Sequence, residues 1–378
     1  MKSIVVVGAG FAGLTAIQTL RRKGCNAPIT LVAPQPAMLY YPSLIWVPAG
    51  LRNERDITIP LVGFINRYRV NYVQGSVTEL DAGVRRLGTT AGEMEYECLV
   101  VTSGGRYIKK LPGIEHTFIP CEGYRQVADM KERLDRLEEG TLAFGFAGNP
   151  NEPAAMRGGP LFEFLFGIDT LLRRQKRRDR FDLVFFTPAA EPGKRLGAKA
   201  MGSLLREMER RGIRSHVGHK LKGFAADRVM TEGGDVKSDL TVFIPGMTGP
   251  AWVAQSGLPL SEGGFIRADA HCRVPGFEGS VYVAGDAGSF PGPEWMPKQA
   301  HLADLQAQTL ARNLIGDLRG ERPAHTFRPE LICIVDTLDN GVLVFRNSRY
   351  SGVFRNYTLH WSKRLFEWLY FNKYRHSS

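Results

Sequence analysis

The stretch VVVGAGFAG (residues 5–13) decides the fold of this chain. Three consecutive β-branched residues predict a buried parallel strand, and the glycines after them predict a tight turn into a helix. At this spacing Gly8 permits the turn, Gly10 lets the backbone approach a pyrophosphate, and Gly13 lets the helix pack close to the strand. The pattern therefore predicts an α/β dinucleotide-binding unit at the start of the chain.

A second strand and turn, VYVAGDAGSFPG, follows at residues 281–292. It ends in Asp286 after Gly285, and an aspartate at such a turn accepts hydrogen bonds from sugar-like hydroxyls, as on the ribityl chain of FAD. The predicted strand at 29–32 is followed by Ala-Pro-Gln instead of the acid that usually binds the adenosine ribose. The two turns together predict FAD, bound without a ribose carboxylate.

Length and composition are consistent with a two-domain globular flavoprotein. A chain of 378 residues exceeds one ordinary core, which predicts two domains. No run reaches the roughly 18 to 20 apolar residues needed to span a bilayer, and the N-terminus does not read as a secretory signal. The scattered cysteines predict neither a disulfide framework nor a metal site and favour a reducing compartment. They are Cys25, Cys98, Cys121, Cys272 and Cys333.

The net charge of +11 raises the question of a nucleic-acid or anionic membrane partner. The densest basic run, residues 173–180, follows apolar residues at helical spacing. We expect it to close a helix and to be mostly solvated, with membrane or partner contact as the alternative. Because no nucleic-acid module and no aromatic interleaving are present, no nucleic-acid partner is expected.

The last segment predicts an amphipathic helix from Leu359 onward. Tryptophans with flanking cations suit a helix that lies in a membrane interface. The alternative is a helix docked on the protein's own core or on a second subunit of a homo-oligomer. The apolar face is expected to hold Leu359, Trp361, Leu365, Phe366, Trp368, Leu369 and Phe371, and the rest Lys363, Arg364, Glu367, Lys373 and Arg375.

The middle of the chain predicts a second βαβ-like unit without its nucleotide turn. A strand at 142–146 leads to a segment interrupted by Pro150 and Pro153, and the Gly-Gly-Pro at 158–160 comes too late. An NADH site needs a glycine turn that feeds directly into a helix, whereas this helix is expected to start at Leu161. We therefore expect that electrons do not arrive from NADH.

These features resemble the sulfide:quinone oxidoreductases and their relatives, the flavocytochrome c sulfide dehydrogenases and the type II NADH dehydrogenases. The resemblance covers almost the whole chain, and its Pro-Ser-x-x-Trp and Pro-Lys elements are more specific than the glycine turns. Besides the two turns and the C-terminal tail, it rests on YPSLIWV (41–47), DITIPL (56–61), LVVTSGG (99–105) and MPK (296–298).

The resemblance implies two Rossmann-like domains, the second inserted in the first, and a C-terminal membrane-associating region. Residues 1–108 and 240–320 are then the FAD domain, 109–239 the inserted domain and 321–378 the C-terminal region. A lysine beside the flavin pyrimidine ring stabilises the anionic reduced flavin in such enzymes, and Lys298 matches it. The residues expected to contact FAD are Gly8, Gly10, Gly13, Pro42, Val77, Thr102, Gly104, Gly285, Asp286 and Lys298.

The resemblance also assigns the catalytic candidates Cys333, Cys121, Glu163 and Lys298. Cys121 and Cys333 match two of the three family cysteines, but Arg157 stands where the middle one is expected, six residues before Glu163. Three outcomes stay open: Cys121 pairs with Cys333, Cys333 works alone through a flavin C4a adduct, or the donor is not sulfide. Arg157 either attracts an anionic sulfur substrate or is a solvated loop arginine. Cys25, Cys98 and Cys272 are expected to be structural.

Glu163 lies among phenylalanines and is expected to have a raised pKa suited to proton transfer, or else to be a helix-start glutamate. His301 is a weaker candidate for a proton relay.

The resemblance implies an FAD-dependent enzyme that passes electrons from sulfide or another reduced sulfur compound to quinone. It is expected to be bound peripherally to the cytoplasmic side of the cell membrane. The alternatives are a dehydrogenase for another donor such as NADH, and a redox sensor or flavin subunit like that of flavocytochrome c.

Overall fold

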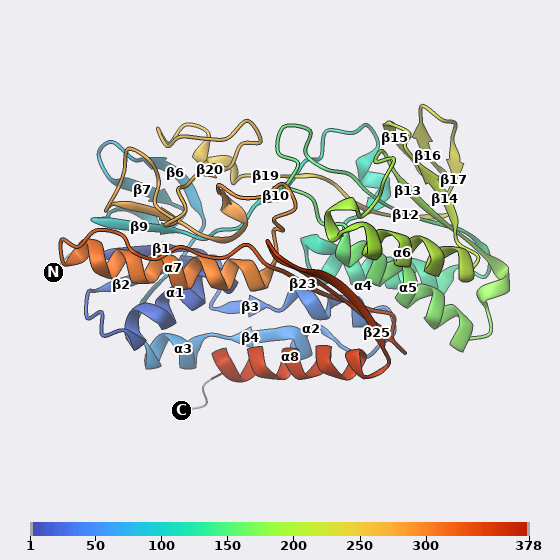
Figure 1. The fold of residues 1–378 in the computed structure, drawn as a ribbon, viewed down its shortest axis with the longest axis horizontal. Helices are drawn as coiled ribbons and strands as arrows, with labels where there is room; N and C mark the ends of the chain where they lie inside the picture. Colours follow the sequence, from blue (N-terminus) through green and yellow to red (C-terminus); the bar gives the residue numbers. More distant parts are fainter. Residues whose placement is uncertain (1–2, 376–378) are drawn as a thin grey trace.

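The computed structural model describes residues 3–375, which form two parallel sheets side by side and a C-terminal part that crosses both (Figure 1). The first sheet lies on the left of the view, the second lies on the right, and the last helix runs along the lower edge. The two glycine turns therefore belong to the left-hand half, beside the junction with the second sheet.

The first sheet is parallel and contains the three strands predicted above at its glycine turns and at 29–32, together with β9 and β5. Its central strand is β1, whose residues 4–7 are almost completely buried, as expected for a β-branched run covered on both faces. The order is β21 (Val281–Val283), β9 (Cys98–Val101), β1 (Ile4–Val7), β2 (Ile29–Ala33) and β5 (Asn71–Gln74).

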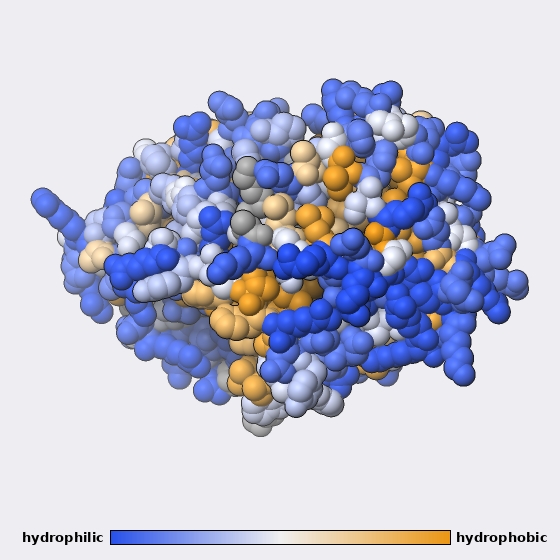
Figure 2. All heavy atoms as spheres, turned by 45° about the vertical axis from the view of Figure 1, so that its right-hand side comes forward, coloured by the Kyte–Doolittle hydropathy of each residue, from blue (hydrophilic) through white to orange (hydrophobic). Residues whose placement is uncertain are grey.

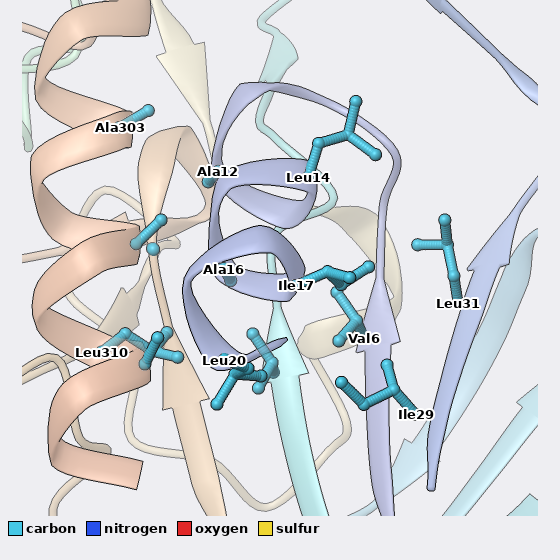
Figure 3. Close-up of a cluster of buried hydrophobic side chains, with 14 of the residues drawn as sticks. Val6, Ala12, Leu14, Ala16, Ile17, Leu20, Ile29, Leu31, Ala303 and Leu310 are labelled. Atoms are coloured by element: carbon cyan, nitrogen blue, oxygen red, sulfur yellow. The ribbon is translucent and has the colours of Figure 1, made fainter. Parts of the chain in front are cut away.

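Helix α1 (Phe11–Arg22) leaves the first glycine turn and packs against α7 (Ala300–Leu318) (Figure 3). Ala12 and Ala16 point toward α7, and Ala303 points back. These small side chains let the helices lie close together, so the second turn comes near the first: a Cβ on Gly285 would lie 3.3 Å from the Cβ of Ala12. Residues almost 300 positions apart thus build one site.

The second sheet is also parallel and is formed by residues between β9 and β21, which makes it an insertion in the first. Its order is β11 (Thr117–Phe118), β18 (Leu240–Ile244), β12 (Gly140–Phe146), β13 (Phe181–Thr187) and β14 (Arg214–Val217). The boundary expected after residue 239 is one strand early, because β18 pairs with β11 and β12. Helices α4 (Tyr124–Arg136), α5 (Gly159–Arg174) and α6 (Ala198–Arg210) accompany this sheet.

Short antiparallel elements complete both halves. They are β3 (Ala37–Leu39) with β4 (Thr58–Pro60), β6 (Val77–Asp81) with β7 (Arg86–Thr89) and β8 (Gly92–Glu95), β10 (Arg106–Tyr107) with β19 (Met247–Thr248), and β15 (Leu221–Ala225) with β16 (Arg228–Thr231) and β17 (Val236–Lys237). β20 (Ile266–Arg267) pairs with β22 (Gly288–Ser289) in parallel. The helices α2 (Glu54–Ile57) and α3 (Val62–Arg67) and the 3₁₀ turns η1 (Tyr41–Trp46) and η3 (Pro120–Glu122) connect them.

The C-terminal part is an antiparallel sheet followed by helix α8 (Thr358–Tyr374). The sheet contains β23 (Leu331–Asp336), β24 (Gly341–Arg346) and β25 (Ser351–Asn356), and β23 also packs on α5 of the inserted domain. Because α8 contacts β23 and β24 while its last residues lie in the core of the first domain, this part ties the two halves together.

Helix α8 has its polar side inward. The exposed side chains are the apolar Trp361, Leu365, Phe366, Trp368 and Leu369, as the sequence pattern predicts. Phe371, expected on the same apolar face, is instead buried in the core, and Lys363 and Glu367 of the polar side are buried against the protein, so this side of the helix is docked. Among the described residues, no helix is long and apolar enough to cross a membrane.

The basic run at 173–180 ends α5 and is mostly exposed, as expected, but two of its arginines also form ion pairs. Arg173, Arg178 and the later Arg211 converge on Asp169, which is fully buried. Burial opposes the ionised form of Asp169, but the hydrogen bonds from the three guanidinium groups lower its pKa overall. Arg173 and Arg178 therefore belong to an ion-pair network around Asp169, while most of the run is exposed.

Candidate functional site

One cavity of about 970 Å³ joins the two halves and reaches helix α8. It is lined by twelve of the thirteen residues that the sequence analysis proposes for the site. These are Gly8, Gly10, Pro42, Val77, Thr102, Gly104, Gly285, Asp286, Lys298, Cys121, Glu163 and Cys333. The exception, Gly13, lies in the first turn of α1, where it has a packing role.

The first turn forms a cradle in which two positions, Gly8 and Gly13, accept only glycine. Gly8 has a φ of +103°, and a Cβ there would lie 2.5 Å from the carbonyl oxygen of Thr102. A Cβ on Gly13 would lie 2.0 Å from the carbonyl oxygen of Gly8. A Cβ on Gly10 would meet nothing within 4 Å, so at this point the backbone borders the open cavity. The first turn of α1 there offers N–H groups and the positive helix end, which fits the pyrophosphate of FAD.

The second turn places Gly285, Asp286 and Lys298 on the opposite wall. The backbone N–H of Gly285 donates to Gln306 Oε1 at 2.9 Å, which holds the turn against α7. Lys298 Nζ donates to the carbonyl oxygen of Gly288 at 2.7 Å and lies 3.9 Å from the ring centre of Phe265. Burial lowers the pKa of Lys298 to about 8, although the negative charge of Asp286 opposes that shift.

Arg157 forms an ion pair with Asp286, from the loop between β12 and α5. Its side chain is 22 % exposed, so the expectation of a solvated loop arginine is wrong. The hydroxyl of Tyr107 lies 3.5 Å from Arg157 Nη1. The loop between β12 and α5 therefore supplies a half-buried cation to the cavity.

The two candidate cysteines line the cavity and are not bridged to each other. Cys333 is in β23, and its Sγ lies 3.3 Å from where a Cβ of Gly159, the first residue of α5, would be. Burial raises the pKa of Cys333 to about 12, and the nearby Glu163 adds to the shift. Burial also raises the pKa of Cys121, although Arg157 and Tyr107 oppose it. Both groups are therefore thiols at neutral pH.

Glu163 is buried and is paired with Lys363 of α8. Its Oε1 also accepts the backbone N–H of Asp336 at 2.9 Å. Burial raises the pKa of Glu163 to about 6, and the interactions with Lys363 and Asp336 N–H oppose the shift. The expectation of a raised pKa is correct, and a carboxyl group with this pKa exchanges protons readily near neutrality. His301 also lines the cavity, with Nε2 3.2 Å from Glu330.

Several cavity residues are absent from the sequence predictions, notably Tyr107, Lys363, Phe366 and Tyr370. Lys363, Phe366 and Tyr370 recur at helical spacing in α8, which places them near one another along the helix. That spacing could have shown that the three residues lie together. An interpretation based on the apolar face of the helix instead leaves Lys363 on the polar side. Tyr107 gives no signal in the sequence.

Comparisons with known proteins agree with this geometry. Residues 2–139 match the family model described as pyridine nucleotide-disulphide oxidoreductase. A sulfide-quinone reductase from Aquifex aeolicus is 22% identical over 354 residues, which cover 89% of this chain and 81% of that protein. The crystal structure of the sulfide:quinone oxidoreductase from Aquifex aeolicus has a TM-score of 0.90 at 20% identity, covering 99% of this chain and 92% of that chain.

A shorter similarity reaches a type II NADH:quinone oxidoreductase from Staphylococcus saprophyticus, with 31% identity over 108 residues. It covers 27% of this chain and 26% of that protein. Fold, glycine cradle and comparisons together define the class: the chain is an FAD-dependent oxidoreductase with a pyridine nucleotide-disulphide oxidoreductase domain. Within that class it is a homologue of sulfide-quinone reductase.

Proposed function

We propose that this protein passes electrons from sulfide or another reduced sulfur compound through FAD to a quinone at a membrane surface. The observation that carries the proposal is the single cavity, which extends from Gly8 and Gly10 past Cys333 to Lys363 and Phe366 of α8. A relative named sulfide-quinone reductase, similar over most of both chains, supports the same donor and acceptor.

Bound FAD supplies the two-electron chemistry, accepting electrons from the donor and releasing them to the acceptor. The chain's own residues position and neutralise the groups that react. The glycine cradle holds the pyrophosphate, and Asp286 offers a carboxylate to the ribityl hydroxyls, the same carboxylate that pairs with Arg157. Lys298, which lines the cavity, would place its positive charge near the flavin ring and so lower the energy of the reduced cofactor.

The donor side is the wall that holds Cys333 and Cys121. The route through a disulfide between the middle and late cysteines is closed, because Arg157 occupies the middle position. Cys333 is then the thiol best placed to meet a sulfur donor, because it lies at the start of α5 inside the cavity. Its neutral state means that the donor, and not the cysteine, brings the negative charge.

The acceptor side is the wall formed by Glu163 and α8. A quinone needs an apolar slot for its ring and tail, and two protons when it is reduced. Phe366 and Tyr370 supply apolar surface, while Glu163, with its pKa of about 6, and Lys363 supply proton-carrying groups. Because Phe366 also belongs to the exposed outer side of α8, the slot borders the surface from which a lipid-dissolved quinone would enter.

The outer side of α8 is the proposed membrane-binding surface. Trp361 and Trp368 are 62 % and 59 % exposed, and apolar residues fill the positions around them. In Figure 2 a patch of hydrophobic residues interrupts an otherwise largely hydrophilic surface. Exposed apolar surface of this kind, on a helix too short to span, suits insertion to headgroup depth.

NADH is the competing donor, favoured by the partial similarity to a type II NADH:quinone oxidoreductase. The inserted domain disfavours it. Between β12 and α5 the chain makes a long loop with two prolines, and Arg157 of that loop extends toward Asp286 instead of forming a phosphate-binding turn.

The test is donor-dependent reduction of a short-chain quinone by the purified FAD protein. We expect sulfide to support turnover, NADH to support none, and Cys333→Ser to lose sulfide turnover while keeping its flavin. Cys25→Ser, at a buried position outside the cavity, is the matched control. Turnover with NADH and none with sulfide would replace the proposal with the alternative donor.

A further inference from the structure

Arg157 is the residue of the cavity that the sulfide-to-quinone scheme leaves unexplained. It stands six residues before Glu163 and reaches Asp286, which lies in the other domain. Burial opposes its charge, but Asp286 and Tyr107 outweigh burial and keep the pKa of Arg157 above its usual value. The guanidinium is therefore a permanent cation inside the site.

This cation has more hydrogen-bond donors than the protein satisfies. A guanidinium carries five N–H donors. One terminal nitrogen binds Asp286, and the other reaches Tyr107 only at 3.5 Å. Nε is buried and has no hydrogen-bond partner in the part of the chain that the structure describes. A buried donor without an acceptor is unfavourable, so the site is suited to an additional acceptor.

A second source of positive potential adjoins Arg157. The next residues, Gly158 and Gly159, start the sixteen-residue helix α5 and line the same cavity. No side chain caps this helix start, so its first N–H groups and the positive end of its dipole face the site. Cys333 Sγ lies against this same turn.

We propose that Arg157 and the first turn of α5 form an anion-binding subsite that holds the sulfur donor as an anion beside Cys333. The inference rests on the proposed function and names the form in which its donor binds. The class of ligand is a small, polarisable sulfur anion, such as hydrosulfide or the terminal sulfur of a persulfide.

The surrounding charges are consistent with one bound anion. Asp286 is the carboxylate in contact with Arg157, and Lys298 is the second cation near it. The thiols of Cys121 and Cys333 are neutral because burial raises the pKa of each. A substrate anion therefore meets no thiolate that would repel it. The other carboxylates that act on Lys298 and Cys333 are Glu152 and Glu163, and Glu163 is paired with Lys363. In this arrangement Arg157 stands in the place of a cysteine. It binds the sulfur anion through its charge, whereas a thiol would bind the sulfur covalently.

The test uses the FAD-loaded protein and thiocyanate, a redox-inert sulfur anion. Its dissociation constant is measured by calorimetry and by the change in the flavin absorbance spectrum. We expect Arg157→Met to weaken binding by about tenfold or more, as loss of a charge-assisted hydrogen bond predicts. Arg157→Gln should weaken it similarly, and Arg157→Lys should retain most of the affinity.

Arg195→Met is the matched control, because Arg195 is a second arginine lining the same cavity and leaves the α5 turn intact. We expect it to stay within about twofold of the wild-type affinity. The proposal is overturned if Arg157→Met and Arg157→Gln bind thiocyanate like the wild type, or if Arg195→Met weakens binding equally. If Arg157→Met loses its flavin, the Gln variant decides.

The outcome is separable from that of the proposed function. If sulfide fails to reduce the flavin but thiocyanate binding depends on Arg157, the subsite stands and sulfide is the wrong donor. If sulfide reduces the flavin but the Arg157 variants bind thiocyanate as the wild type does, sulfide is the correct donor and the proposed subsite is wrong.

Discussion

Among single residues, Gly13 carries the clearest consequence for the cofactor. A Cβ at this position would lie 2.0 Å from the backbone oxygen of Gly8, and backbone cannot move aside as a flexible side chain can. Gly13→Val should therefore distort the cradle and yield protein without flavin, measured by the ratio of visible to ultraviolet absorbance after purification. Gly316→Ala in α7, where an added Cβ meets no atom nearer than 3.7 Å, is the control and should keep its flavin. Full flavin occupancy in Gly13→Val would show that the turn does not hold the cofactor.

Glu163 gives a prediction on pH. Its pKa is raised to about 6 by burial, so it carries a proton below this pH and loses it above. If it donates a proton to the quinone, the rate at which quinone reoxidises the reduced flavin should fall as the pH rises through about 6. Glu163→Gln should remove that inflection, and flavin reduction by the donor should keep its own pH dependence. An unchanged inflection in Glu163→Gln would assign the proton to another group.

Lys363, the ion-pair partner of Glu163, gives a second test of the same site. It stabilises the ionised form of Glu163, so it lowers the pKa of that group against the effect of burial. Lys363→Met should move the inflection to higher pH by about one unit, the size expected for a close opposite charge. A shift to lower pH would contradict the ion pair.

On the scale of one element, helix α8 has a polar inner side and an apolar outer side. Its inner side forms hydrogen bonds to both halves of the molecule: Lys363 to Glu163 in α5, and Tyr370 to Asp304 in α7. Its outer side is apolar and exposed. Because polar contacts fix the rotation of the helix, the apolar side stays outward even though burying it would otherwise be favourable.

The inner side predicts a stability effect. Glu367 accepts hydrogen bonds from Ser43 and Arg52, and its side chain is 10% exposed. Glu367→Ala leaves both donors without their acceptor and should destabilise the protein by about 2 kcal/mol, measured by urea unfolding. The double variant with Arg52→Met should recover part of this loss. A single-variant effect below about 0.5 kcal/mol would mean that the contact does not dock the helix.

The outer side predicts membrane binding. Replacing Trp361 and Trp368 together by serine should weaken binding to vesicles by about tenfold or more, since each indole buries apolar area in the interface. The melting temperature should hold, because both side chains are exposed. Val84→Ser, an exposed apolar residue in the first domain, is the control and should bind vesicles normally. Equal vesicle binding by the double variant would exclude α8 as the membrane surface.

Across the whole molecule, the features that the sequence predicted correctly are those that depend on residues close together in the chain. The cradle at Gly8, Gly10 and Gly13 is such a case, because the spacing itself encodes close backbone approach. The contacts that it missed join residues far apart in the chain. Arg157 and Asp286 are 129 positions apart, and Lys363 and Glu163 are 200 apart. A charge-based interpretation places such residues in water, since only the fold shows that each has a buried partner.

The same reason explains the domain boundary. The strand at 240–244 follows directly on residues of the inserted domain, and nothing in its composition shows which sheet it joins. Its pairing with β11 and β12 is seen only in the folded structure. The helix after Gly-Gly-Pro, by contrast, was predicted to within two residues, because glycine and proline mark a helix start locally.

The central claim is that one cavity conducts electrons from a sulfur donor through FAD to a quinone. Double-mixing stopped-flow spectroscopy without oxygen tests it most directly, with flavin absorbance followed as sulfide is added first and a short-chain quinone second. The account predicts rapid loss of the oxidised flavin absorbance with sulfide, then full recovery with quinone, and no loss with NADH in place of sulfide. Absorbance that persists in sulfide, or that bleaches but does not recover with quinone, would contradict it.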